Sequence, residues 1–294
     1  MDRATGEIEQ FEIREPASQT IPFVYNSPHS GRCYPTAFLH ETRLDSIAIR
    51  RSADHYVDEL FGEAPELGAP LLAAHFPRAY LDVNREPYEL DPKMFEGPLP
   101  PFANISSLRV AGGLGTIPRI VAENMEIYRR RLSVEEGLGR IETIYKPYHA
   151  ALRRLIARTH ARFGTSILID CHSMPGNIQL SGSALRPDFI IGDRYGTSAS
   201  AELSRAAIAI LTELGFSAVR NKPYAGGFIT EHYGRPARGL HALQIEVNRG
   251  LYIDELTLEK RPDFNVLAAG LFTFMRQLAE FAEEYSGTTA LAAE

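Results

Sequence analysis

The stretch SILIDCH at residues 166–172 is an apolar run that ends in an acid and a histidine. Apolar runs of similar length recur along the chain, at residues 21–26, 70–76, 79–84, 188–193 and 241–248. Near-continuous apolar strands are typical of a sheet that is covered on both faces. We therefore expect the six runs to form a central sheet.

Helical patterns lie between these runs, at residues 54–64, 121–131, 135–162, 198–214 and 263–284. Ser133 and Glu136 have the spacing of a capping box, which predicts the start of the longest helix. Strands that alternate with helices predict an α/β fold with a largely parallel central sheet flanked by helices.

The length and composition predict a globular protein of one large domain or two small ones, and because the sequence shows no clear domain boundary we expect a single domain over residues 1–294, the catalytic one if the protein is an enzyme. The chain is 44% hydrophobic and 23% charged, which is enough to build a sizeable core. Residues 86–118 are rich in Pro and Gly and too long for an ordinary connection, so we expect a loop over the active site. We expect the tail, about residues 286–294, to be frayed.

Charge and cysteine content restrict the partners and the compartment. A formal net charge of −6 argues against binding of nucleic acid, which normally needs a basic surplus. The two cysteines, Cys33 and Cys171, form no CxxC motif and indicate a reducing compartment. The N-terminus is charged, and the longest apolar stretch, residues 266–275, is shorter than the roughly 20 residues that span a bilayer. We expect a cytoplasmic protein without a membrane partner.

Two histidines follow apolar runs in the same context, where ligands of open α/β sheets bind. His29 follows residues 21–26 and His172 ends residues 166–172, and each is followed by a serine and a turn residue. A single such histidine is more often structural, but two at equivalent positions raise the prospect of a metal site. Catalytic zinc is typically held by three protein groups from His, Asp and Glu.

The third ligand is expected from the segment RSADHYVDELF. We favour Asp54, because a residue in the first turn of a helix projects toward the strand ends, but Asp58 is an alternative. A helix-capping role for Asp54 is also open. Asp170, two residues before His172, is expected on the same side of its strand, where it would orient a ligand histidine or be a satisfied buried carboxylate.

The segments LDVNR (residues 81–85) and IEVNR (residues 245–249) each end an apolar run with Asn and Arg. A guanidinium binds a carboxylate through paired hydrogen bonds. Arg85, with Asn84, is the better candidate for a substrate carboxylate because the long loop follows it, and Arg249 is the second. For a single Arg, a structural ion pair is the competing interpretation.

Glu246 lies in an otherwise apolar run, so it must be paired, metal-bound or functional. Beside a metal it could act as a general base, whereas a salt bridge to an arginine is the alternative. Arg78 is a candidate for stabilising an oxyanion. Gly226 and Gly227 would let the backbone approach the second carboxylate of a substrate, although a simple turn would also need them.

Taken together, the motifs resemble those of the N-formylglutamate amidohydrolases. The resemblance runs in order from about Pro22 to Tyr252, and its blocks are SPHSG (27–31), DHYVDEL (54–60), DVNR (82–85), YKPYH (145–149), IDCHSMP (169–175), GDRYGTS (192–198), PYAGGFIT (223–230) and QIEVNRGLY (244–252).

The resemblance implies a mixed sheet between helices, similar to the zinc carboxypeptidases and aspartoacylases. It implies hydrolysis of N-formyl-L-glutamate, the last step of one route of histidine degradation. Carried over to this chain, it implies zinc on His29, Asp54 and His172, a general base at Glu246, and a substrate carboxylate on Asn84 and Arg85. The acid ligand departs from the carboxypeptidase HxxE spacing, because Arg32 stands where the Glu would be; Asp54 and Asp58 therefore both stay open.

Two alternatives to this function remain. The same machinery could act on another N-acyl or N-carbamoyl acidic amino acid, because a small acyl group offers a pocket little to recognise. A non-catalytic binder of acidic amino acids could keep the arginine clamp without the metal. The presence of His29, His172 and Glu246 together argues against the binder, which has no use for a base beside a metal site.

Overall fold

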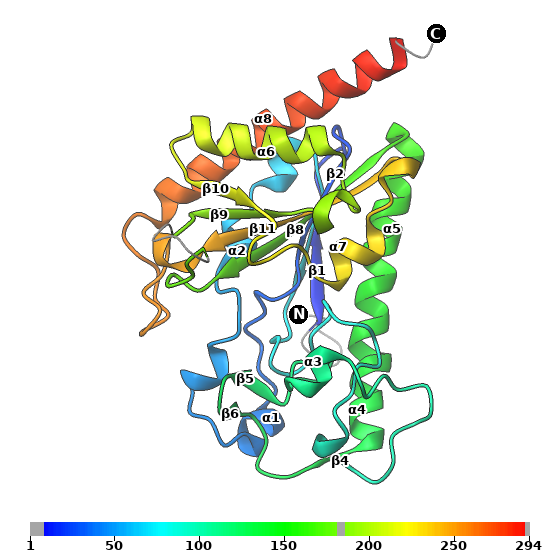
Figure 1. The fold of residues 1–294 in the computed structure, drawn as a ribbon, viewed down its shortest axis with the longest axis vertical. Coiled ribbons are helices and arrows are strands. Elements are labelled where there is room, and N and C mark those ends of the chain that lie inside the picture. Colours follow the sequence, from blue (N-terminus) through cyan, green and yellow to red (C-terminus); the bar gives the residue numbers. More distant parts are fainter. Residues whose placement is uncertain (1–8, 181–185, 292–294) are drawn as a thin grey trace. The chain divides into compact units, whose positions relative to one another are not determined.

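The computed structural model describes residues 9–180 and 186–291, and the side chains up to residue 284 (Figure 1). The chain divides into two compact units. The first unit comprises the described residues up to Glu12, with Pro28–His55 and Ala73–Arg153. The second unit comprises Ile13–Ser27, Tyr56–Leu72 and the described residues from Arg154 onward. The single catalytic domain expected from composition stays a prediction.

The second unit is built on a seven-stranded sheet with the order β1-β3-β2-β8-β11-β9-β10. Strand β8 runs parallel to β2 and β11, and β9 runs parallel to β10, whereas β9 and β11 are antiparallel. The predicted largely parallel, mixed sheet is therefore confirmed. The strands are β1 (Phe11–Arg14), β2 (Phe23–Ser27), β3 (Leu71–Ala74), β8 (Ser166–Met174), β9 (Phe189–Gly192), β10 (Ala218–Arg220) and β11 (Leu240–Asn248).

The two faces of this sheet carry different residues. One face packs against α2, α6 and α8 through a core that includes Tyr25, Ile169 and Ile245. Figure 1 shows α6 and α8 along the same side of the sheet, and the two helices contact each other. Because successive side chains of a strand point to opposite faces, the neighbours of these core residues face the other way. The opposite face thus carries the polar side chains, Asp170 and Glu246 among them.

The helices of the second unit follow the predicted pattern with one exception. The predictions at 198–214 and 263–284 are confirmed as α6 (Ala201–Glu213) and α8 (Phe264–Leu291), and α7 (Phe228–Tyr233) is an additional short helix. The helix expected at 54–64 is wrong in extent, because α2 covers only Val57–Leu60. It starts late because Tyr56 has a left-handed backbone, with φ of 59°. The backbone of α8 continues into the segment that we expected to be frayed.

The longest predicted helix is confirmed in the sequence-continuous helices α4 (Val134–Arg140), a π-helical turn (Ile141–Tyr145) and α5 (Lys146–Phe163). Its predicted cap is also confirmed, because the Ser133 hydroxyl accepts a hydrogen bond from the Glu136 amide at 3.0 Å. The other elements of the first unit are α1 (Thr36–Glu41), α3 (Leu108–Ala111), β4 (Phe95–Glu96) paired with β7 (Leu132–Ser133), and β5 (Ile120–Ala122) paired with β6 (Met125–Glu126). Short 3₁₀ helices lie at Ala48–Arg50, Ala64–Leu67, Pro92–Met94, Arg194–Gly196, Pro236–Arg238 and Arg249–Leu251.

Two predicted elements of the first unit are wrong. The helix expected at 121–131 is the β5–β6 hairpin, in which Asn124 takes a left-handed conformation that ends a helix. The strand expected at 79–84 is a series of turns. Its alternating Leu81 and Val83 are fully buried, but the Asp82 amide bonds the Thr116 carbonyl at 2.8 Å instead of a strand. Alternation here reflects burial of a loop and not pairing in a sheet.

Across the described ranges, no helix combines the length and apolar character needed to cross a bilayer. Cys33 and Cys171 are both free thiols.

Candidate metal and substrate site

His29 lies just after β2, in the first unit, between two buried carboxylates. Its Nε2 atom is 2.7 Å from Oδ1 of Asp82, and its Nδ1 atom is 3.4 Å from Oδ2 of Asp54. The Asp54 amide also donates to the His29 carbonyl at 3.0 Å, which fixes the two segments together. All three side chains are about 1% exposed.

The hydrogen bond to Asp82 determines what Nδ1 of His29 can do. When Nε2–H donates to Asp82, the neutral imidazole has its lone pair on Nδ1. Nδ1 of His29 and the Asp54 carboxylate oxygen are then both hydrogen-bond acceptors. Two acceptors repel each other at this distance unless a cation or a proton lies between them. The pair is therefore suited to share a metal ion, in the manner of carboxylate–histidine–zinc triads.

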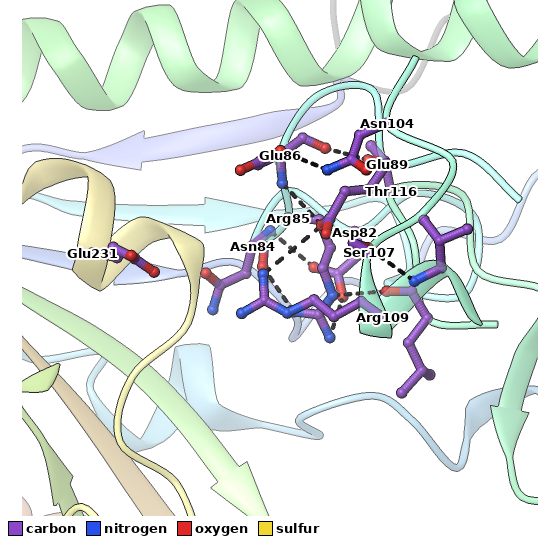
Figure 2. A network of polar contacts seen from close by, with 12 residues as sticks. Asp82, Asn84, Arg85, Glu86, Glu89, Asn104, Ser107, Arg109, Thr116 and Glu231 are labelled. Atoms are coloured by element: carbon purple, nitrogen blue, oxygen red, sulfur yellow. Dashed lines mark hydrogen bonds and ion pairs between the residues drawn. The ribbon is translucent and has the colours of Figure 1, made fainter. Parts of the chain in front are cut away.

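Asp82 is one of the residues in the network of polar contacts in Figure 2. Besides His29, it accepts from the Asn84 amide at 2.8 Å and from Nε of Arg78 at 3.0 Å, and it lies 3.5 Å from NH2 of Arg85. Burial alone raises the pKa of the Asp82 carboxyl, but the charges of Arg85 and Arg78, with the hydrogen bond from His29, hold that pKa well below its usual range. The buried carboxylate thus stays ionised and organises His29 and two arginines.

Asp82 was given no function from the sequence, although the LDVNR segment contains a signal for one. The acid of the LDVNR segment stands two residues before Asn84, at the position where its side chain can accept the Asn84 amide in a turn. The competing structural ion pair for Arg85 is therefore present, because Arg85 contacts Asp82.

The second unit repeats the histidine–aspartate pairing on strand β8. Nε2 of His172 lies 2.9 Å from Oδ2 of Asp170, two residues earlier on the same face. Oδ1 of Asp170 accepts from the Asn26 side chain on β2 at 2.7 Å. As in the pairing of His29 with Asp82, a buried carboxylate holds Nε2 and leaves Nδ1 as the acceptor nitrogen. The expectation that Asp170 orients a histidine fits this contact.

The register of β8 and β11 sets two polar rows side by side. Asp170 is opposite Gln244, and His172 is opposite Glu246. Glu246 is 7% exposed, and its Oε1 atom accepts from Nε2 of Gln244 at 2.8 Å. Oε1 of Gln244 accepts in turn from the Gly227 amide, also at 2.8 Å. Gln244 was missed in the sequence because a glutamine inside an apolar run carries no signal of its own.

The glycine pair begins α7. Gly227 is its N-cap residue, and Gly226 has φ of 119°, a backbone conformation that favours glycine. The neighbouring Gly192 of β9 also needs to lack a side chain, because a Cβ atom there would lie 2.7 Å from the Ala225 carbonyl carbon. The backbone of this loop therefore lies directly against the sheet.

The donor set fits a metal ion. His29, Asp54 and His172 are all buried and form a group that could hold one. Two imidazoles and one carboxylate are a common set for catalytic zinc. Asp58 is not in this group, and instead its carboxylate and carbonyl oxygens contact the guanidinium of Arg14. Asp54 precedes α2 and does not lie in its first turn, so the reason for favouring Asp54 over Asp58 was wrong. The backbone hydrogen bond to His29 is what positions Asp54.

Arg85 is 11% exposed and has structural partners on each guanidinium nitrogen. Nε donates to the Leu114 carbonyl and NH1 to the Asn84 carbonyl, both at 2.8 Å, while NH2 contacts Asp82. The Thr116 hydroxyl also donates to the Glu86 carbonyl, as Figure 2 shows. The segment 86–118 is therefore tied to Arg85 and Glu86 by hydrogen bonds at its far end.

Arg249 lies in the second unit, at the end of β11. Its Nε donates to the Ser173 hydroxyl at 3.0 Å, and the side chain is buried. The guanidinium is thereby held beside the end of β8, at Ser173, which follows His172 in the chain. Arg78, in contrast, is the most exposed of the three arginines, at 24% for its side chain.

Comparison with known proteins agrees with the motifs and the geometry. Residues 21–253 match the model of the family described as N-formylglutamate amidohydrolase. The chain belongs to this family. The match includes every residue predicted for the site.

Several members of the family are similar along most of their length. N-formylglutamate deformylase of Pseudomonas putida is 30% identical over 80% of this chain and 83% of its own. The deformylase of Pseudomonas aeruginosa PAO1 is 29% identical over the same shares. The crystal structure of N-formylglutamate amidohydrolase from Ralstonia eutropha JMP134 superposes with a TM-score of 0.88 at 36% identity, covering 94% of this chain and 99% of that one.

Proposed function

We propose that the protein is a zinc-dependent amidohydrolase that converts N-formyl-L-glutamate into formate and L-glutamate. The observation that carries this proposal is the buried group His29, Asp54 and His172, together with the carboxylate beside each imidazole. The names of the two Pseudomonas relatives support the substrate. The proposal includes a place in histidine degradation and a cytoplasmic location.

In this proposal His29, Asp54 and His172 hold the metal. Asp82 and Asp170 fix the two imidazoles so that each presents Nδ1, which reduces the conformational freedom lost on binding. When bound, zinc would polarise the formyl oxygen and lower the pKa of a water molecule toward about 7.

Glu246 is the proposed general base. It accepts a proton from water as the hydroxyl adds to the formyl carbon, and it delivers that proton to the glutamate nitrogen as the C–N bond breaks. Formate and L-glutamate result, so that one water is consumed for each amide. The buried position of Glu246 limits competing hydration of its carboxylate.

Arginines and glycines are proposed to bind the substrate. Arg85 has five N–H donors, so it can contact a carboxylate while it keeps its bonds to Leu114, Asn84 and Asp82. Asn84 acts with it. We assign the other carboxylate to Arg249 and to the backbone around Gly226 and Gly227, where the glycines carry no side chain of their own; the Gly227 amide itself donates to Gln244. Arg78 is the proposed stabiliser of the oxyanion.

The experiment that tests the proposal is formate release from N-formyl-L-glutamate by purified protein. We expect release to stop in the presence of a chelator and to return when zinc is added to the dialysed protein. The zinc content of each sample is measured alongside, and His29→Ala and His172→Ala are expected to lose zinc.

The outcomes separate the alternatives. Zinc binding without formate release would mean that the substrate is wrong, and N-acetyl and N-carbamoyl acidic amino acids would be tried next. A protein that takes up no zinc and releases no formate would contradict the enzymatic proposal and favour a binder of acidic amino acids. Activity that survives complete removal of metal would exclude the role of zinc.

A further inference from the structure

Gln244 occupies an unusual position between the proposed base and the glycine loop. It is 5% exposed, on the polar face of β11, two residues before Glu246. A buried primary amide needs partners for both of its ends. Here its oxygen accepts from the backbone of Gly227, and its nitrogen donates to the Glu246 carboxylate, each at 2.8 Å.

The two contacts determine which way the amide faces. A backbone N–H can only donate, so the Gly227 amide requires the oxygen of Gln244. The NH₂ group must then face Glu246, whose ionised carboxylate can only accept. Reversal of the amide would set two donors against each other at Gly227 and two acceptors at Glu246. The loop backbone thus dictates a donor aimed at the carboxylate.

The loop that dictates this orientation is itself held rigidly. Ala225 packs onto Gly192, which is opposite Gln244 in the β9–β11 register. The Arg194 amide donates to the Ala225 carbonyl at 2.7 Å, and the Arg194 side chain contacts the Gly226 carbonyl at 3.3 Å. The chain from the loop through Gln244 to Glu246 is therefore continuous and has few alternative conformations.

We propose that Gln244 is a positioning residue, which holds the Glu246 carboxylate in the rotation needed for proton transfer and links that rotation to the glycine loop at Gly226 and Gly227. This inference rests on the proposed function of Glu246. A donor on one carboxylate oxygen fixes the direction in which the other oxygen faces. Misplacement of a reacting group by about 1 Å can cost on the order of 10²-fold in rate.

The test is a double-mutant cycle on formate release with Gln244→Met and Glu246→Gln. Gln244→Met has a similar volume but neither donates to Glu246 nor accepts from Gly227. We expect its kcat to fall about 10- to 100-fold, with KM changed less than about threefold because substrate contacts remain. In the Glu246→Gln background the same change should lower kcat by less than about threefold, because the group that Gln244 positions is already lost.

A merely structural role predicts a different result. In that case the two losses in kcat would multiply in the double variant, and this outcome would overturn the positioning role while Glu246 remained the base. Wild-type kcat in Glu246→Gln would overturn both the base and the inference. Wild-type kcat in Gln244→Met would overturn the inference alone.

Two further variants separate positioning from folding. Gln244→Glu keeps an acceptor for the Gly227 amide and a matching volume but sets a carboxylate against Glu246, so we expect the fold to persist and kcat to fall at least as far as in Gln244→Met. Gln19→Met is the matched control, since Gln19 is a buried glutamine of the same unit whose amide bonds Phe23 and Thr159. It should lower thermal stability and leave kcat unchanged; an equal loss of kcat in both methionine variants would contradict positioning.

Discussion

The Nε2 atom of His29 lies 2.7 Å from Oδ1 of Asp82, and both side chains are almost wholly buried. The contact selects the imidazole tautomer that presents Nδ1 toward Asp54. His172 and Asp170 repeat it at 2.9 Å in the second unit. In both pairs a buried carboxylate holds the imidazole in the orientation that the proposed metal site requires.

This arrangement predicts that Asp82→Asn weakens zinc binding by about 10- to 100-fold, the usual effect of removing the carboxylate partner of a metal-bound histidine. An amide accepts a hydrogen bond from His29 less strongly and carries no charge. The dissociation constant is measured by competition with a chromophoric chelator.

Asp91→Asn is the matched control for this experiment. Asp91 is a buried carboxylate of the same unit, and it accepts from Arg119 at 2.8 Å. The control should lose stability but keep its affinity for zinc. An Asp82→Asn variant that binds zinc as tightly as this control would contradict the orienting role of Asp82.

Glu246→Gln is predicted to lower kcat by about 10²- to 10⁴-fold, the range expected for loss of a general base. The amide is nearly isosteric, so KM and zinc content should remain close to wild type. Steady-state kinetics and metal analysis of the same preparation check this prediction. Glu202→Gln, a partly exposed change on α6, serves as the control. A Glu246→Gln enzyme with the same kcat as this control would remove Glu246 from the mechanism.

Arg85→Met is predicted to raise KM for N-formyl-L-glutamate by about 10-fold or more, because a charge-assisted contact to a carboxylate contributes about 1.5–3 kcal/mol. The variant also loses the hydrogen bond to the Leu114 carbonyl. Thr116→Val separates the two effects, since it removes only the hydroxyl bond to Glu86 in the same segment. Both variants should show faster hydrogen exchange over 86–118, but only Arg85→Met should raise KM; equal KM values would exclude Arg85 from substrate binding.

Asp193 is predicted to make stability depend on pH. Burial alone raises the pKa of its carboxyl, but hydrogen bonds from Arg220, Ser204, Asn221 and the Gly196 amide hold that pKa below the ordinary value of 3.8. A carboxyl whose folded pKa is depressed contributes stability above its unfolded pKa and loses that contribution as the pH falls through the folded value.

Asp193→Asn should therefore unfold at a lower urea concentration than wild type at pH 7. The difference between the two urea midpoints should narrow as the pH falls below about 4. Urea titrations at pH 7, 5 and 3.5 measure it. Asp263→Asn, on an exposed side chain, should follow wild type at each pH. A gap that stays constant down to pH 3.5 would show that the charge of Asp193 is not what stabilises the fold.

The sequence predicted most of the sheet and the long helices because their patterns are local. Strand β8 is buried along its whole length, as a continuous apolar run predicts, and helix α6 buries one face with the helical period. Residues 79–84 gave the same signal without being a strand. Leu81 and Val83 alternate because both are buried beneath a loop, and the partner that replaces a strand, Thr116, lies far along the chain.

The candidate site divides in the same way. The sequence by itself determined the candidate metal-ligating residues, the carboxylate in β11 and the family motifs, because each of these side chains is visible in its own segment. Only the tertiary structure decided which partners hold them: Asp82 on His29, Gln244 between Gly227 and Glu246, and Arg14 on Asp58. Hydrogen bonds between segments depend on distances that no local pattern encodes, and those bonds orient the side chains that do the chemistry.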